Sequence, residues 1–230
     1  RLSDEPEQLR RIYTSAMSVL ALLAVPAATG IFALADPIVS VALGAQWLAA
    51  IPLLQILAFN GALLMLHSSM SALLVGAGRV REVTGVSAAF VAILVAALLL
   101  LTPRYGVVGA AFASLATAVA ATPIYLAMLR TRLGLPPWIF INALTRPVIA
   151  SGVMCVVLTM VVPPRAEVAS GLQATAWLLG GVVLGIVIYV TAIFAMWSLA
   201  GRPDGAERHV IDRVAQELRR RFGARRSAQP

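Results

Sequence analysis

The long apolar stretches of this chain have three acidic, basic or histidine side chains within them or at their edges: Asp36, His67 and Arg146. No two carboxylates are spaced as an acid–base pair, and there is no Asp-x-Asp motif. Cysteine and histidine residues form no cluster with the spacing of metal ligands. The sequence therefore predicts neither a metal nor another cofactor, and it argues against a hydrolytic or metal-dependent enzyme.

His67 lies near the middle of an apolar stretch, with Asn60 seven residues before it and Ser71 four residues after it. On a helix these positions share one face. A polar stripe at membrane depth usually faces the interior of a helix bundle or a water-filled cavity, where it can meet a polar substrate. The alternative is hydrogen bonding between helices, which contributes about 1 kcal/mol per bond. The spacing does not decide between these two roles.

Arg146 precedes Pro147 at the start of another apolar stretch. A guanidinium group matches the geometry of phosphate oxygens, so Arg146 is a candidate contact for a substrate phosphate. The alternative is that its side chain extends to the lipid headgroups and anchors the helix. Asp36 is interpreted as the solvated end of the first apolar stretch.

Six stretches are long and apolar enough to cross a bilayer, for which about 20 residues are needed. Hydrophobic residues make up 60% of the chain and charged residues 12%, and the mean hydropathy is +0.89. These values indicate an all-α membrane protein with six transmembrane helices in one bundle. The six predicted spans are Ile12–Ala35, Leu48–Ala77, Val83–Leu101, Val107–Leu129, Pro147–Val162 and Leu172–Leu199.

The basic residues, all of them Arg, alternate between the two sides of these spans. Connections with two or more Arg alternate with connections that have at most one, which places both termini in the cytoplasm by the positive-inside rule. The chain thus divides into a connector (1–11), a six-span bundle (12–199) and a basic tail (200–230), and we expect it in the cytoplasmic membrane.

The net charge of +8 is concentrated in the cytoplasmic segments. Nucleic acid is therefore not an expected partner, whereas anionic lipid of the inner leaflet is. The tail has the pattern of a basic amphipathic helix that could lie on that leaflet or dock on the protein itself.

Local features predict details of the spans. Small residues at Gly109, Ala113, Thr117 and Ala121 form a stripe along which another helix can approach closely, and Gly181 and Gly185 repeat the spacing in the last span. Residues 136–145 predict a short helix on the cytoplasmic face, separate from the span that begins at Pro147. The second span is too long for one straight crossing, so it must tilt, kink or project from the membrane.

Three segments resemble a known family: Asp36–Ala58, Leu74–Arg79 and Tyr105–Ala111. Their spaced small residues, Pro and Trp resemble the C-terminal half of bacterial polysaccharide flippases, within the multidrug, oligosaccharidyl-lipid and polysaccharide exporter superfamily. The resemblance implies a transporter of twelve to fourteen spans in two bundles around a central cavity. This chain would supply one bundle, and its partner would be the missing N-terminal half of the same protein.

The resemblance implies that the protein flips a polyprenyl-pyrophosphate-linked glycan across the membrane by alternating access, for cell-surface polysaccharide biosynthesis. Two alternatives are a drug or cation exporter of the same superfamily and a membrane enzyme that acts on lipid-linked sugars. Cation-coupled export normally uses a carboxylate deep in the membrane, and no predicted span contains one. We therefore expect Asn60, His67, Ser71 and Arg146 to contact substrate in the transport cavity.

Overall fold

The computed structural model describes residues 6–162 and 171–199. Every element in these ranges is helical, and five segments are long and apolar enough to span a membrane. The chain is thus a multi-pass membrane protein of the all-α class, as predicted. The elements are α1 (Pro6–Ala33), α2 (Ala35–Ala42), the 3-10 helix η2 (Ala45–Ala50), α3 (Ile51–Gly76), α4 (Val80–Leu133), α5 (Trp138–Val161) and α6 (Gly171–Leu199).

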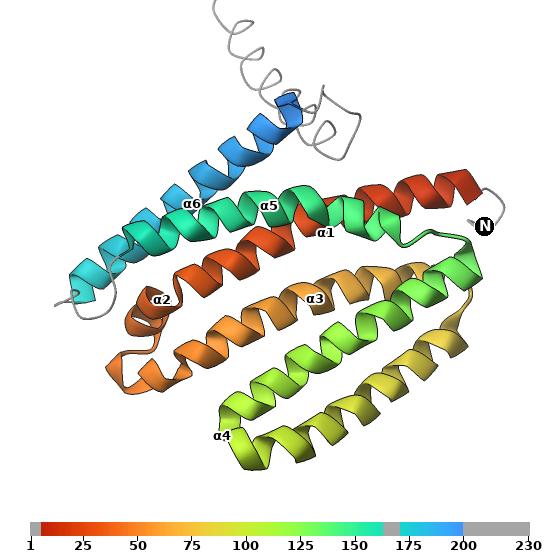
Figure 1. Ribbon diagram of the computed structural model, residues 1–230, viewed down its shortest axis with the longest axis horizontal. Coiled ribbons are helices and arrows are strands. Elements are labelled where there is room, and N and C mark those ends of the chain that lie inside the picture. The colour runs from red at the N-terminus through yellow and green to blue at the C-terminus, as the bar shows by residue number, and fades with distance from the viewer. Residues whose placement is uncertain (1–5, 163–170, 200–230) are drawn as a thin grey trace, which may run out of the picture.

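The difference between six predicted spans and five membrane-length helices lies in α4, which has 54 residues. A straight helix of that length would measure about 80 Å, far more than a bilayer. Instead, the helix turns back on itself in Figure 1, and Gly106 at the bend has φ 59° and ψ −141°. Only glycine adopts this conformation readily. The predicted spans Val83–Leu101 and Val107–Leu129 fall in the first and second arms of this hairpin.

A second glycine makes the hairpin tight. A Cβ atom on Gly109 would clash with the carbonyl oxygen of Leu101 and would lie 2.8 Å from its carbonyl carbon. The two arms therefore approach within backbone contact just beyond the bend. The motif at residues 105–111 places one glycine where the chain reverses and another where the arms meet.

The helices lie side by side in the order α4, α3, α1, α5 and α6 (Figure 1). α1 thus lies between α3 and α5. The largest buried cluster joins the first half of α1, the end of α3, both ends of α4 and the start of α5, which lie on the same side of the molecule in Figure 1. Its members are Tyr13, Met17, Ala21, Leu66, Met70, Leu74, Val86, Ala121, Tyr125, Leu129, Leu135, Ile139, Phe140 and Ala143.

Two helix boundaries differ from the sequence-based expectation. The separate helix predicted for residues 136–145 is wrong, because α5 runs without a break from Trp138 to Val161. Pro147 is buried within α5, where it removes one backbone donor but does not end the helix. The long second span is divided, as η2 precedes α3 and the α-helical part begins at Ile51 with Pro52 in its first turn.

The prediction that the small residues pack is confirmed. Ala113 and Thr117 are fully buried and Ala121 is 1% exposed. On α6, a Cβ atom on Gly181 would lie 2.6 Å from the side chain of Leu34, and one on Gly185 would lie 3.3 Å from that of Leu158. Glycine therefore allows α6 to pack closely against the junction of α1 and α2 and against α5.

Candidate functional site

His67 is buried between α3 and the second arm of α4, with only 4% of its surface exposed. Its Nε2 atom lies 3.0 Å from the hydroxyl oxygen of Thr122. That hydroxyl in turn donates to the backbone carbonyl of Ala118 at 3.1 Å. When the proton of the Thr122 hydroxyl is used in this bond, the matching tautomer of His67 has its proton on Nε2 and donates to Thr122, and we assign this tautomer. The neutral ring then leaves Nδ1 as the acceptor nitrogen.

Tyr125 makes the second connection between the same two helices. Its ring stacks on the ring of His67, with centroids 5.0 Å apart and planes 25° from parallel. Ser71, one turn after His67, donates to the hydroxyl oxygen of Tyr125 at 3.0 Å. His67, Ser71, Thr122 and Tyr125 therefore form one polar cluster, which we call the α3–α4 cluster. It has the geometry of hydrogen bonding between membrane helices.

Two polar atoms on this face of α3 are buried without a hydrogen-bond partner among the residues that the structure describes: Nδ1 of His67 and Oδ1 of Asn60. Both are acceptors, and a buried acceptor without a donor costs about 1–3 kcal/mol. Such groups are rare enough that each requires an explanation. One explanation is that these atoms receive a donor from a ligand or from another state of the protein.

Arg146 lies apart from this cluster. It is half-buried on α5, and α1 separates α5 from α3. His67 and Ser71 thus both form hydrogen bonds to the second arm of α4, and Asn60 lies on the same helix, α3, as they do. Arg146 does not lie beside these three residues. Asp36 lies in the first turn of the short helix α2, beyond the end of α1.

Sequence reasoning did not identify Thr122 and Tyr125 as members of the cluster. The available signal was their spacing, because positions i and i+3 share a helix face and both side chains carry a hydroxyl. Nothing in the sequence shows which helix that face meets. The pairing of this arm of α4 with α3 is a property of the tertiary structure.

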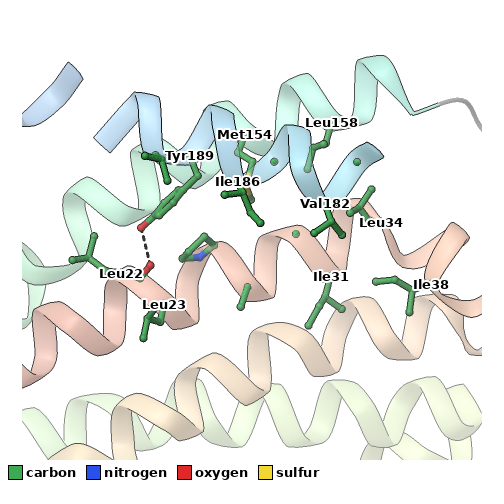
Figure 2. Close-up of a pocket in the computed structure, with 16 residues that line it drawn as sticks. Leu22, Leu23, Ile31, Leu34, Ile38, Met154, Leu158, Val182, Ile186 and Tyr189 are labelled. Atoms are coloured by element: carbon green, nitrogen blue, oxygen red, sulfur yellow. Dashed lines mark hydrogen bonds between the residues drawn. The ribbon is translucent and has the colours of Figure 1, made fainter. Parts of the chain in front are cut away.

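Among the described residues, two hollows lie away from this cluster. The first, of about 470 Å³, is bounded by α1, α5 and α6 and is lined almost wholly by apolar side chains (Figure 2). Its one hydroxyl, on Tyr189, donates to the carbonyl oxygen of Leu22 at 2.9 Å. The second, of about 650 Å³, lies between the two arms of α4. Neither hollow contains Asn60, His67, Ser71 or Arg146.

Residues 1–52 match the model of a family of polysaccharide biosynthesis proteins. The match covers the N-terminal connector, α1, α2 and η2, and α1 is the middle helix of the row and contributes one wall of the first hollow. It also includes the start of the segment at 36–58 that resembles the flippases. No curated protein and no solved structure matches the chain. The match is a similarity over residues 1–52 of the 230-residue chain to proteins of polysaccharide biosynthesis.

Proposed function

We propose that this chain is one bundle of a flippase that moves a lipid-linked oligosaccharide across the cytoplasmic membrane during cell-surface polysaccharide biosynthesis. The observation that carries the proposal is the match of residues 1–52 to polysaccharide biosynthesis proteins in a chain made of membrane-length helices. Polysaccharides exported in this way are assembled on a polyprenyl-pyrophosphate carrier, which is the expected substrate of this family.

The proposed topology has six crossings, with the two arms of α4 as separate spans and both termini in the cytoplasm. The bend at Gly106 supports this topology, because it divides α4 into two arms that can each cover the bilayer. The distribution of Arg gives the orientation: Arg79 and Arg130 lie at the open end of the hairpin, and a single Arg104 lies at its bend.

The proposed mechanism is alternating access, in which this bundle moves against a second bundle, the N-terminal half expected of such a protein. The arrangement of the helices supports the need for a partner. They lie in a row, and the two hollows described above, both among residues 6–162 and 171–199, are lined largely by apolar side chains. A sugar headgroup needs a cavity with hydrogen-bonding side chains, which a second bundle facing this one would enclose.

Within this mechanism we propose that Asn60, His67 and Ser71 contact the glycan. Nδ1 of His67 and Oδ1 of Asn60 are acceptors without a partner, so each can accept a hydrogen bond from a sugar hydroxyl. His67 and Ser71 are held by α4 and would reach the glycan when α3 and α4 shift during the transport cycle. Arg146 would contact the pyrophosphate near the cytoplasmic entrance.

Transport is preferred over catalysis for a chemical reason. In the part of the chain that the structure describes, the carboxylates are those of Glu7, Asp36 and Glu82; each lies in the first turn of its helix, and no two of them share a helix as an acid–base pair would. The same distribution disfavours a cation-coupled drug exporter, because such exporters use a carboxylate deep in the membrane.

Deletion of the gene in its native host tests the proposal and separates the three classes. A flippase deletion should abolish surface polysaccharide while the lipid-linked glycan accumulates intact in the membrane. In spheroplasts that glycan should be inaccessible to an added lectin until the membrane is permeabilised. Loss or altered composition of the lipid-linked glycan would instead indicate an enzyme. Normal surface polysaccharide with increased drug sensitivity would indicate a drug exporter.

A further inference from the structure

The hollow between the two arms of α4 is lined by residues from 82–89 and 123–132, which places it toward the open end of the hairpin and away from the bend at Gly106. Its volume is about 650 Å³. Its walls are mainly apolar, and its polar residues come from the first turns of the first arm and the last turns of the second. The lining residues are Glu82, Gly85, Val86, Ala89, Pro123, Ile124, Ala127, Met128, Thr131 and Arg132.

Small residues on both arms keep this space open. Gly85 and Ala89 lie one turn apart on the first arm, and Ala127 lies on the facing side of the second. A Cβ atom built on Gly85 would have no atom within 4 Å. The glycine is therefore not required by close packing with a neighbouring helix, and a larger side chain there would enter the hollow without displacing its surroundings.

The rim of the hollow is positively charged. The carboxylate of Glu82 lies 3.5 Å from a guanidinium nitrogen of Arg79 and 3.8 Å from one of Arg132. Both Arg side chains remain about half exposed, at 45% and 51%. Arg81 and Arg130 are exposed at the same end of the hairpin. This end of the hairpin thus has four guanidinium groups and one carboxylate, and two of the four contact that carboxylate.

We propose that this hollow binds an anionic phospholipid of the cytoplasmic leaflet, with its phosphate at Arg79 and Arg132 and one acyl chain between the arms of α4. A guanidinium group binds phosphate oxygens with charge-assisted hydrogen bonds. Basic pockets between membrane helices on the cytoplasmic side are a recurring type of anionic-lipid site. The apolar walls leave water no partner below the rim, so a hydrocarbon chain fills that volume more favourably.

This inference goes beyond the proposed transport function, because it assigns a lipid to a part of the chain that contains none of the candidate glycan contacts. It uses the proposed orientation of the hairpin, in which the open end faces the cytoplasm. Its test measures lipid binding alone, so its outcome does not depend on whether the protein is a flippase.

The test compares lipid binding by variants of the full chain, purified and delipidated in an uncharged detergent. Melting temperature and native mass spectrometry are recorded as phosphatidylglycerol or phosphatidylcholine is added. Gly85→Leu fills the hollow, and Arg79→Gln combined with Arg132→Gln removes the charge of the rim. Matched controls are Gly180→Leu, at another glycine with no atom near its Cβ position, and Arg104→Gln at the bend.

We expect phosphatidylglycerol to stabilise the wild-type chain and both controls, and phosphatidylcholine to have a much smaller effect. In Gly85→Leu and in the double Arg variant, the half-maximal phosphatidylglycerol concentration should rise roughly tenfold, and one retained lipid should be lost. The basic tail, with eight Arg, is present in every variant, so its own lipid binding cancels in the comparison.

Three outcomes would overturn the proposal. Equal stabilisation of Gly85→Leu and wild type would show that lipid does not enter the hollow. Equal stabilisation by phosphatidylcholine would show that the charged rim has no role. Displacement of phosphatidylglycerol by a much lower concentration of a polyprenyl pyrophosphate, in wild type but not in Gly85→Leu, would reassign the hollow to the lipid carrier.

Discussion

The hydroxyl group of Tyr189 on α6 donates to the backbone carbonyl of Leu22 on α1 at 2.9 Å (Figure 2). Leu22 is four residues before Pro26, so its carbonyl would normally accept from the residue 26 amide, which proline lacks. An unsatisfied carbonyl within a bilayer costs several kcal/mol. The hydroxyl group of Tyr189 thus replaces the backbone hydrogen bond that Pro26 removes from α1. The donor and the acceptor are 167 residues apart in the chain.

Tyr189→Phe should lower the free energy of unfolding by about 1 kcal/mol, since it removes this donor but keeps the ring. The same change in a Pro26→Ala background should cost less than half of that, because residue 26 then supplies the missing amide. Unfolding in mixed micelles measures both values. Tyr105→Phe, at an exposed tyrosine, is the control. Equal losses in the two backgrounds would mean that the bond does not compensate for Pro26.

The α4 hairpin should cross the membrane twice. In a Cys155→Ala background, Arg104→Cys should react with an impermeant maleimide from outside intact cells, because it lies at the bend. Arg79→Cys and Arg130→Cys, at the open end, should react only after permeabilisation. Labelling of all three from the same side would show that α4 enters and leaves the membrane without crossing it.

Gly106→Ala should destabilise the protein by about 1–3 kcal/mol, because a Cβ atom is strongly disfavoured at φ 59° and ψ −141°. Gly109→Ala should have a cost of similar size, since its Cβ atom would clash with the backbone of Leu101. Gly85→Ala, in open space, should be nearly neutral. Melting temperatures of the three variants test the hairpin; a Gly106→Ala variant as stable as wild type would contradict the bend.

His67→Leu should impair glycan export while leaving the membrane level of the protein unchanged, because it removes the acceptor nitrogen Nδ1. Thr122→Val separates this role from packing, as it removes the same hydrogen bond to α3 but keeps the imidazole. Surface polysaccharide and immunoblots of membranes are the readouts. We expect Thr122→Val to export more than His67→Leu does; equal defects would reassign His67 to helix packing.

Arg146→Ala should have a milder effect on export than His67→Leu, because Arg146 lies on α5, away from the α3–α4 cluster. Arg146→Lys keeps the charge but loses the planar guanidinium group. If phosphate recognition is its role, export by Arg146→Lys should fall between that of wild type and that of Arg146→Ala. Identical export by all three would leave Arg146 as an anchor at the headgroups.

The sequence by itself determined the class of the protein and the approximate positions of its long apolar helices. Hydropathy is a local property, so a run of about 20 apolar residues identifies a helix that can span a bilayer wherever it lies. The small-residue stripes were also predictable, because glycine and alanine at a four-residue spacing allow close approach to any partner helix. Those residues are buried, as expected.

The tertiary structure decided which helices meet. The periodicity of α3 placed His67 and Ser71 on one face, but only the fold shows that this face meets Thr122 and Tyr125. It also decided that α5 continues through Pro147 and that Tyr189 satisfies the carbonyl of Leu22. The physical reason is that a helix face can bond to whichever neighbour the packing supplies, and local sequence does not specify that neighbour.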